Sequence, residues 1–146
     1  MAAEAKPSDA ALGNPLIMKL RHAAALTAED CALLEAVIGS RRIAVDAGEA
    51  LVSEGEKPVS MHLVVDGIAA RHKDLAGGRR SIVAFFVTGD LCDLDVAILG
   101  EMDHTISTLT PCTIIRIADR TIEEIKAQSP RISRALHWST LVDEAI

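Results

Sequence analysis

Glycines next to acidic residues recur along the middle of this sequence, as Gly48-Glu49, Gly55-Glu56, Asp66-Gly67 and Gly89-Asp90. Short stretches rich in Val, Ile and Leu separate these pairs, which is typical of short β-strands bounded by turns. Glycine adopts the positive φ angles that many tight turns require, so each pair marks a turn or a close approach of strands. The spacing therefore predicts several short antiparallel strands joined by tight turns.

Helical periodicity precedes this region. Asn14 is expected to cap a helix that begins at Pro15 and whose apolar face extends to Ala24. Thr27, with Asp30 three residues later, is expected to cap a second helix that ends at Gly39-Ser40. Residues 1–13 are Ala-rich and are predicted to be a disordered leader.

From Arg41 the apolar period changes to two, and about eight short strands are expected. A hairpin turn is predicted at Gly77-Gly78, and residues 81–87, which are apolar on both faces, are predicted to form a central strand. Asp119 or Thr121 is then expected to cap a helix, and a final helix begins near Pro130.

The order of helices, strands and helices is that of a mainly β fold with α flanks. It predicts an antiparallel double-sheet jelly roll with N-terminal helices, over residues 14–129, followed by a C-terminal helix over residues 130–146. At 146 residues, with 49% hydrophobic and 25% charged residues, the chain has the size and balance of one globular domain.

Composition limits the partners of the chain. Aromatic residues make up only 2%, so the core is aliphatic and no base-stacking platform can be built. The formal net charge of −6 argues against this segment wrapping a phosphate backbone by itself. No apolar run approaches the roughly 20 residues that span a bilayer, and no secretion signal opens the chain. The sequence therefore predicts a cytoplasmic domain with no membrane contact.

The cysteines Cys31, Cys92 and Cys112 lie far apart and show no paired spacing. Neither a disulfide scaffold nor a zinc site is expected from three such residues, and an iron–sulfur cluster usually needs four thiolates. We interpret all three as small buried hydrophobic residues, and no metal site is predicted.

Four motifs together carry a family resemblance: GEALVSEGE from Gly48, HLVVDG from His62, RSIVAFFVTGD from Arg80 and LTPCTIIRI from Leu109. At these distances they resemble the cyclic-nucleotide-binding-type sensor domain of the Crp/Fnr family of bacterial transcription regulators. The resemblance covers roughly residues 30–146.

The resemblance implies a homodimer. In such proteins a long helix follows the roll and pairs with its twin, and a helix-turn-helix domain then enters the DNA major groove. The C-terminal segment matches the start of the dimer helix, with seam positions Ile132, Leu136, Trp138, Val142 and Ile146. Trp138 and Leu141 could instead pack back on the roll. Nothing resembles a helix-turn-helix, so the DNA-binding domain is absent and DNA would be reached only through a downstream module.

The family's phosphate cassette falls on residues 91–105. Cyclic-nucleotide-binding members carry a Gly-Glu pair there and, some ten residues later, an arginine followed by a small hydroxyl residue. Here Asp93-Leu94 replaces the pair, and Met102 takes the arginine position, followed by Asp103 and His104. A cyclic phosphate would meet carboxylates and no arginine, an arrangement that is unfavourable at modest dielectric. The cassette is thus degenerate, and cyclic AMP is not the expected effector.

Two other kinds of ligand, haem and a simple anion, have candidate residues in the sequence. A neutral imidazole can ligate haem iron, and His62 or His104 would be best placed. The structural alternative is that Asp103 orients His104 or caps the turn. Arg79-Arg80 could hold an anion or form a solvated hairpin tip. No cofactor is predicted.

The leading hypothesis is an effector sensor that shifts against the dimer helix and reorients a downstream DNA-binding domain. The alternative is a regulatory module of a non-DNA effector of kinase or channel type. An enzyme of the cupin kind would need two histidines and a carboxylate at metal-ligand spacing, and the sequence holds no HxH. The chain is therefore not expected to be an enzyme.

Overall fold

A computed structural model describes residues 14–38, 42–92 and 100–144, with the side chains of residues 37–38 and 142–144 outside the description. Two helices come first, α2 (Pro15–Leu20) and α3 (Ala28–Ile38), and two close the chain, α4 (Asp119–Gln128) and α5 (Pro130–Glu144). The strands between them are β1 (Arg42–Val45), β2 (Ala50–Val52), β3 (Ser60–Asp66), β4 (Ala69–Asp74), β5 (Arg80–Phe86), β6 (Leu91–Cys92), β7 (Thr105–Thr108) and β8 (Cys112–Ala118).

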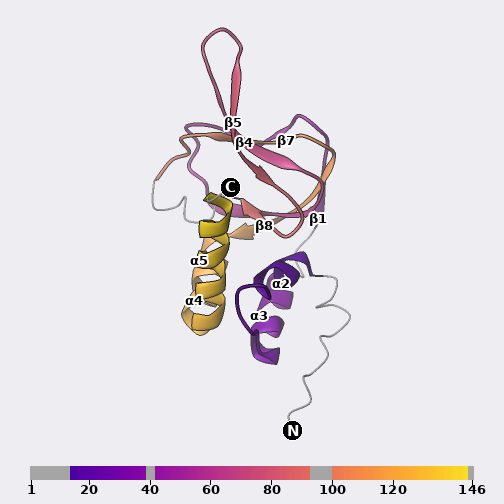
Figure 1. Cartoon of the computed structure of the whole chain (residues 1–146), viewed down its shortest axis with the longest axis vertical. Coiled ribbons are helices and arrows are strands. Elements are labelled where there is room, and N and C mark those ends of the chain that lie inside the picture. The colour runs from indigo at the N-terminus through magenta and orange to yellow at the C-terminus, as the bar shows by residue number, and fades with distance from the viewer. Residues whose placement is uncertain (1–13, 39–41, 93–99, 145–146) are drawn as a thin grey trace.

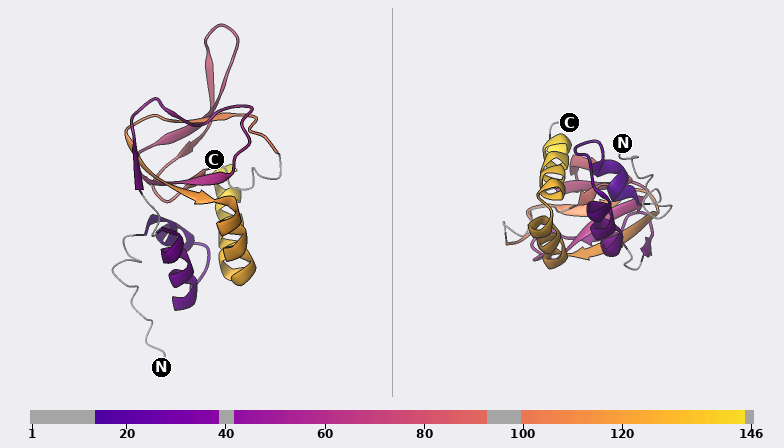
Figure 2. Two further views of the ribbon diagram at one scale, coloured as in Figure 1. Left: turned by 180° about the vertical axis from the view of Figure 1, so that it is seen from behind. Right: turned by 90° about the horizontal axis from the view of Figure 1, so that it is seen from below.

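The strands form two antiparallel sheets of four strands each, in the orders β1-β8-β3-β6 and β2-β7-β4-β5. The helices gather on one side of this double-sheet roll, and the β4–β5 hairpin projects from the opposite side (Figures 1 and 2). The predicted jelly roll with helical flanks is confirmed. The predicted leader, residues 1–13, lies outside the described residues.

Two apolar layers hold the fold together. The layer inside the roll is made by Val52, Val64, Ala69, Phe86, Cys92, Met102, Ile106, Cys112 and Ile114. The layer between the first sheet and the helices includes Leu16, Ile17, Leu20, Leu63, Ile115, Ile122, Ile132 and Leu136. The first sheet is therefore covered on both faces, and the second sheet on its inner face.

The turn glycines behave as predicted. Gly48, Gly55, Gly67 and Gly89 have φ angles of 81°, 89°, 98° and 94°, and the expected hairpin at Gly77-Gly78 is present, with φ of 83° and 77°. All three cysteines are free. Cys92 and Cys112 are buried as predicted, whereas Cys31 is only partly buried and so differs from the prediction. Burial raises the pKa of the Cys31 thiol, which keeps it in the unreactive protonated form.

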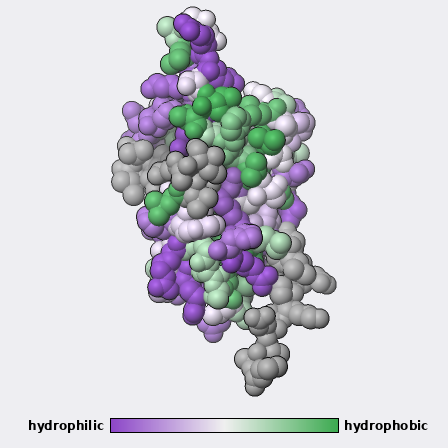
Figure 3. Space-filling view, viewed as in Figure 1, coloured by the Kyte–Doolittle hydropathy of each residue, from purple (hydrophilic) through white to green (hydrophobic). Residues whose placement is uncertain are grey.

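The prediction that residues 81–87 form a central strand is wrong, because β5 is an edge strand of the second sheet and, among the described strands, pairs only with β4. Alternate residues Ala84 and Phe86 face the roll interior, whereas Ile82, Val83 and Phe85 are 43%, 55% and 60% exposed. Figure 3 shows apolar residues gathered on the roll just below the hairpin. Apolar residues on both faces of a segment indicate a β-strand, but they do not show whether that strand has a neighbour on one side or on both.

The predicted N-terminal caps are present. The Asn14 side chain accepts a hydrogen bond from Ile17 N at 3.0 Å, and Thr27 and Asp30 form a reciprocal capping box at 3.0 and 3.1 Å. Two details differ from expectation: α2 ends at Leu20, short of Ala24, and α4 has Ala118 at its N-cap position without a side-chain hydrogen bond. Asp119 lies in the first turn of α4, where the positive end of the helix dipole stabilises its negative charge.

Asp30 joins the first helices to the last ones. Its carboxylate accepts a hydrogen bond from Ser129 Oγ at 2.6 Å and lies 3.3 Å from Arg131 Nε. Burial alone would raise the pKa of Asp30, but the hydrogen bonds from Ser129 and Thr27 and the charge of Arg131 together hold it below its ordinary value. The folded protein therefore favours the ionised carboxylate at this junction.

Replacing Asp30 with asparagine is expected to lower the free energy of unfolding by about 1–2 kcal/mol at pH 7, the cost of one capping bond and one charged hydrogen bond. A lowered pKa stabilises the fold above the unfolded value of 3.8 and loses this effect as pH falls through the folded value. The difference between wild type and D30N should thus begin to shrink as pH falls toward the unfolded value of 3.8, and it should vanish only below the lower folded value. Urea unfolding from pH 7 to pH 3 measures it, with the exposed Glu123→Gln as the control that shows no such difference.

Candidate functional site

The residues predicted for the degenerate cassette fall in two groups. Asp93 and Leu94 lie outside the described residues. Met102 is 3% exposed and packs inside the roll with Val52 and Ile106. Its backbone is held by the β2–β3 turn, because Gly55 N donates to Met102 O and Met102 N donates to Glu56 O, both at 2.8 Å. Met102, predicted to stand at the arginine position of cyclic-nucleotide-binding members, is therefore a core side chain.

Asp103 and His104 form a pair on the surface beside Met102. His104 Nδ1 lies 2.8 Å from Asp103 Oδ1, which confirms the interpretation that Asp103 orients His104. The hydrogen bond from His104, and more weakly the charges of His104 and Arg71, lower the pKa of Asp103. Asp103 is therefore a fixed negative charge just before the start of β7, and it would repel a phosphate placed beside it.

Arg71 is a charged residue of this region that the sequence pattern did not reveal. It lies on β4 opposite Ile106 of β7 and Ala84 of β5, and both of these neighbours face the roll interior. Its guanidinium carbon lies 5.5 Å from the centre of the Phe86 ring, within cation–π range. The inner face of the second sheet therefore carries one positive charge among apolar side chains.

The two histidines considered for haem lie in different settings. His62 is 3% exposed on β3, and His104 engages Asp103 through Nδ1. No group of three or more His, Cys, Asp or Glu side chains that could hold a metal ion occurs in the described part of the chain. Arg80 lies on the exposed hairpin with its Nε 3.1 Å from Asp74 Oδ1, as expected for a solvated tip.

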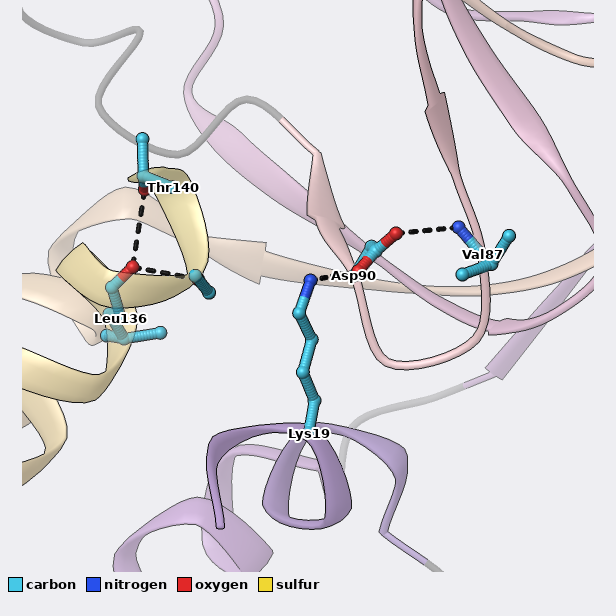
Figure 4. Close-up of polar contacts among 6 residues, drawn as sticks. Lys19, Val87, Asp90, Leu136 and Thr140 are labelled. Atoms are coloured by element: carbon cyan, nitrogen blue, oxygen red, sulfur yellow. Dashed lines mark hydrogen bonds and ion pairs between the residues drawn. The ribbon is translucent and has the colours of Figure 1, made fainter. Parts of the chain in front are cut away.

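A polar contact ties α2 to the turn that leads into the cassette. Lys19 Nζ contacts Asp90 Oδ1, and Asp90 Oδ2 accepts a hydrogen bond from Val87 N at 2.8 Å (Figure 4). Asp90 is 5% exposed and immediately precedes β6. A cleft of about 580 Å³ lies beside this contact and is lined by Pro15, Met18, Lys19, His22, Val65, Val87, Thr88 and Asp90. A shift of the β5–β6 turn would therefore move or break its contact with Lys19 of α2.

The C-terminal helix contributes its apolar stripe to the protein's own core. Ile132 and Leu136, predicted as seam positions, are 0% and 2% exposed and pack with the N-terminal helices. As the chain folds here, these two side chains are core residues and not a free seam. Trp138 is partly exposed and Leu141 is 52% exposed, while the side chain of Val142 and the whole of Ile146 lie outside the description. The Leu136 carbonyl accepts a hydrogen bond from Ser139 Oγ. It also accepts one from Thr140 Oγ1 (Figure 4).

Within the described ranges, none of the helices is both long and apolar enough to cross a bilayer.

Comparison with known proteins places this geometry in a family. A protein-family model for the cyclic nucleotide-binding domain matches residues 42–129. The nitrogen fixation regulation protein FixK of Bradyrhizobium diazoefficiens is 25% identical over 97 residues, which cover 66% of this chain and 40% of FixK. The match thus spans less than half of that relative's length.

Solved structures agree on the fold. A cyclic nucleotide-binding domain from Methylobacillus flagellatus is similar with a TM-score of 0.73 at 13% identity, covering 91% of this chain and 78% of that one. The catabolite activator protein of Thermus thermophilus is similar with a TM-score of 0.67 at 18% identity, covering 87% and 59%. The resemblance inferred from the glycine motifs is confirmed, and this chain belongs to the cyclic nucleotide-binding domain family.

Proposed function

We propose that the chain is the effector-sensing and dimerisation domain of a Crp/Fnr-type transcription regulator. The observation that carries the proposal is the similarity to FixK, a regulatory protein, over 97 residues that make up 66% of this chain. DNA would be contacted through a helix-turn-helix module outside this chain. A regulatory module of a kinase or channel would share the family fold, and the FixK similarity favours the transcription regulator.

A route from the roll to the C-terminal helix supports this proposal. Asp90 immediately precedes the segment assigned to the cassette, and it is bound by Lys19 of α2. Helix α2 in turn packs against α5, since Leu16, Leu20 and Leu136 share one apolar layer. An effector that shifts the β5–β6 turn would thus change the position of α2 against α5, which is the coupling that a sensor requires.

The degenerate cassette leads to the first prediction about ligands. Cyclic AMP and cyclic GMP at millimolar concentration are expected to give no saturable heat in calorimetric titration of this chain. The reason is that Met102 fills the arginine position with a buried thioether and that Asp103 adds a negative charge beside it. A saturating isotherm with either nucleotide would contradict the proposed degeneracy of the cassette.

A substitution at Leu141, on the exposed side of α5, tests whether this helix forms the proposed dimer interface. A glutamate at Leu141 is expected to weaken self-association at least tenfold, because a charge would be desolvated in the interface. Sedimentation of wild type and L141E over a range of concentrations measures the change. Leu75→Glu is the matched control, since Leu75 is 49% exposed, close to the 52% of Leu141, but lies on the hairpin. If wild type, L141E and L75E associate with the same affinity, the exposed side of α5 is not part of the dimer interface.

A further inference from the structure

The inner face of the second sheet holds a guanidinium that the fold itself does not neutralise. Arg71 is half-buried, and neither a hydrogen bond nor an ion pair joins its side chain to another residue in the described ranges. Its one close partner is the ring of Phe86, which is 2% exposed and fixed in the core. The donors of the guanidinium are therefore held in place by stacking and remain available.

The charges around Arg71 limit what it can bind. Asp103 is close enough to be stabilised by the positive charge of Arg71, but the pair is not within ion-pair distance, and Asp103 instead bonds His104. The residues directly across the sheet from Arg71, Ile106 and Ala84, carry no charge. A half-buried cation without a bonded counter-ion is unfavourable, and an anion from solution would relieve this cost.

We infer that Arg71 is the anion-binding residue of the roll, and that it holds the carboxylate or phosphate group of a small organic anion against the inner face of β4. This inference rests on the proposed sensor function and names the chemistry of its effector. Arginine suits this role because its planar fork can bind two oxygens of such a group at once. The site is supplied by β4 and not by the cassette, so it requires no arginine near position 102.

Two anions serve as probes: inorganic phosphate and succinate, each at constant ionic strength maintained with sodium chloride. The Arg71 Nε–H resonance, assigned by its loss in R71Q, is followed by NMR, and the melting temperature is followed in parallel. One or both probes should shift the resonance saturably and raise the melting temperature of wild type. A response to phosphate alone assigns a phosphate ligand, and a response to succinate alone assigns a carboxylate.

Variants separate binding from packing. R71Q should weaken the response at least about tenfold, whereas Asp103→Asn should strengthen it severalfold by removing a nearby negative charge. Arg80→Gln is the matched control, because Arg80 is exposed and already paired with Asp74, and it should respond like wild type. If R71Q does not fold, the wild-type resonance and D103N still test the site.

Two results would overturn the inference. One is the absence of a saturable response of the Arg71 resonance to about 10 mM of either anion, about ten times a Kd of 1 mM. The other is an unchanged anion response in R71Q. Either result would leave Arg71 as a residue that only packs on Phe86. Neither bears on whether the chain dimerises through α5, so the proposed regulator function is judged separately by L141E.

Discussion

Alanine at Gly67 is expected to lower the free energy of unfolding by about 3 kcal/mol or more, from left-handed backbone strain and from steric overlap together. Gly67 has a φ of 98°, and a Cβ placed on it would lie 2.6 Å from both Cys112 Sγ and the Pro111 carbonyl oxygen. The carbonyl belongs to the backbone that leads into β8 and cannot rotate away. The clash would therefore separate the β3–β4 turn from the start of β8.

Gly55→Ala is the matched control for this substitution. Gly55 has a similar φ of 89°, but a Cβ there would have no heavy atom within 4 Å. Only the backbone strain remains, so G55A should cost about 1–2 kcal/mol. Urea unfolding of both variants measures the difference, and circular dichroism checks whether G67A folds. Equal destabilisation of the two variants would show that the β8 start can move, contrary to this account.

The turns and the roll were predictable because they depend on local chemistry. Positive φ at Gly67 and Gly89 and the capping box at Thr27 are decided by a few neighbouring residues, and each was found where expected. The place of β5 in its sheet was not predictable in this way. Its apolar residues indicated a strand, but only the assembled sheet shows that Ile82 and Phe85 lie on an edge strand.

The same limit applies to the site. The aligned motifs predict that Met102 stands at the family's arginine position, and the structure shows only that Met102 is 3% exposed. They gave no reason to consider Arg71, because Ala69 and Ala70 precede it and both are 0% exposed. Two alanines in succession do not tell which face of β4 is turned inward, and the register with Ile106 was needed to decide it.

The C-terminal helix is a third case in which the sequence pattern predicts an element but not its neighbours in the fold. Ile132 and Leu136 recur at helical spacing, which correctly predicts that one face of α5 is buried. Spacing does not distinguish burial in the protein's own core from burial in a partner. The packing with Leu16 and Leu20 assigns both side chains to the core, and a dimer would have to use the other side of α5, where Leu141 is exposed.

Removing the carboxylate of Asp90 is expected to cost about 3 kcal/mol, the low end of the range for breaking a buried ion pair from one side. Asp90→Ala would leave the Val87 N–H without its 2.8 Å acceptor and Lys19 without this partner. The low end applies because the Lys19 side chain is 17% exposed and has a further interaction. Urea unfolding measures the cost, and hydrogen exchange of the α2 amides should show that α2 loses protection first.

Two other variants decide whether this cost belongs to the link between α2 and the roll. Glu123→Ala removes an exposed carboxylate that pairs with a lysine, Lys126, on the surface, and it should change the free energy of unfolding by no more than about 0.5 kcal/mol. Lys19→Met keeps the bond from Val87 N to Asp90, so it should cost less than D90A, and the double variant should cost less than the sum of the two. If D90A and E123A cost the same, or if α2 stays protected in D90A, the turn before the cassette does not hold α2. The proposed path from effector to α5 would then have to run through the α4 side of the core.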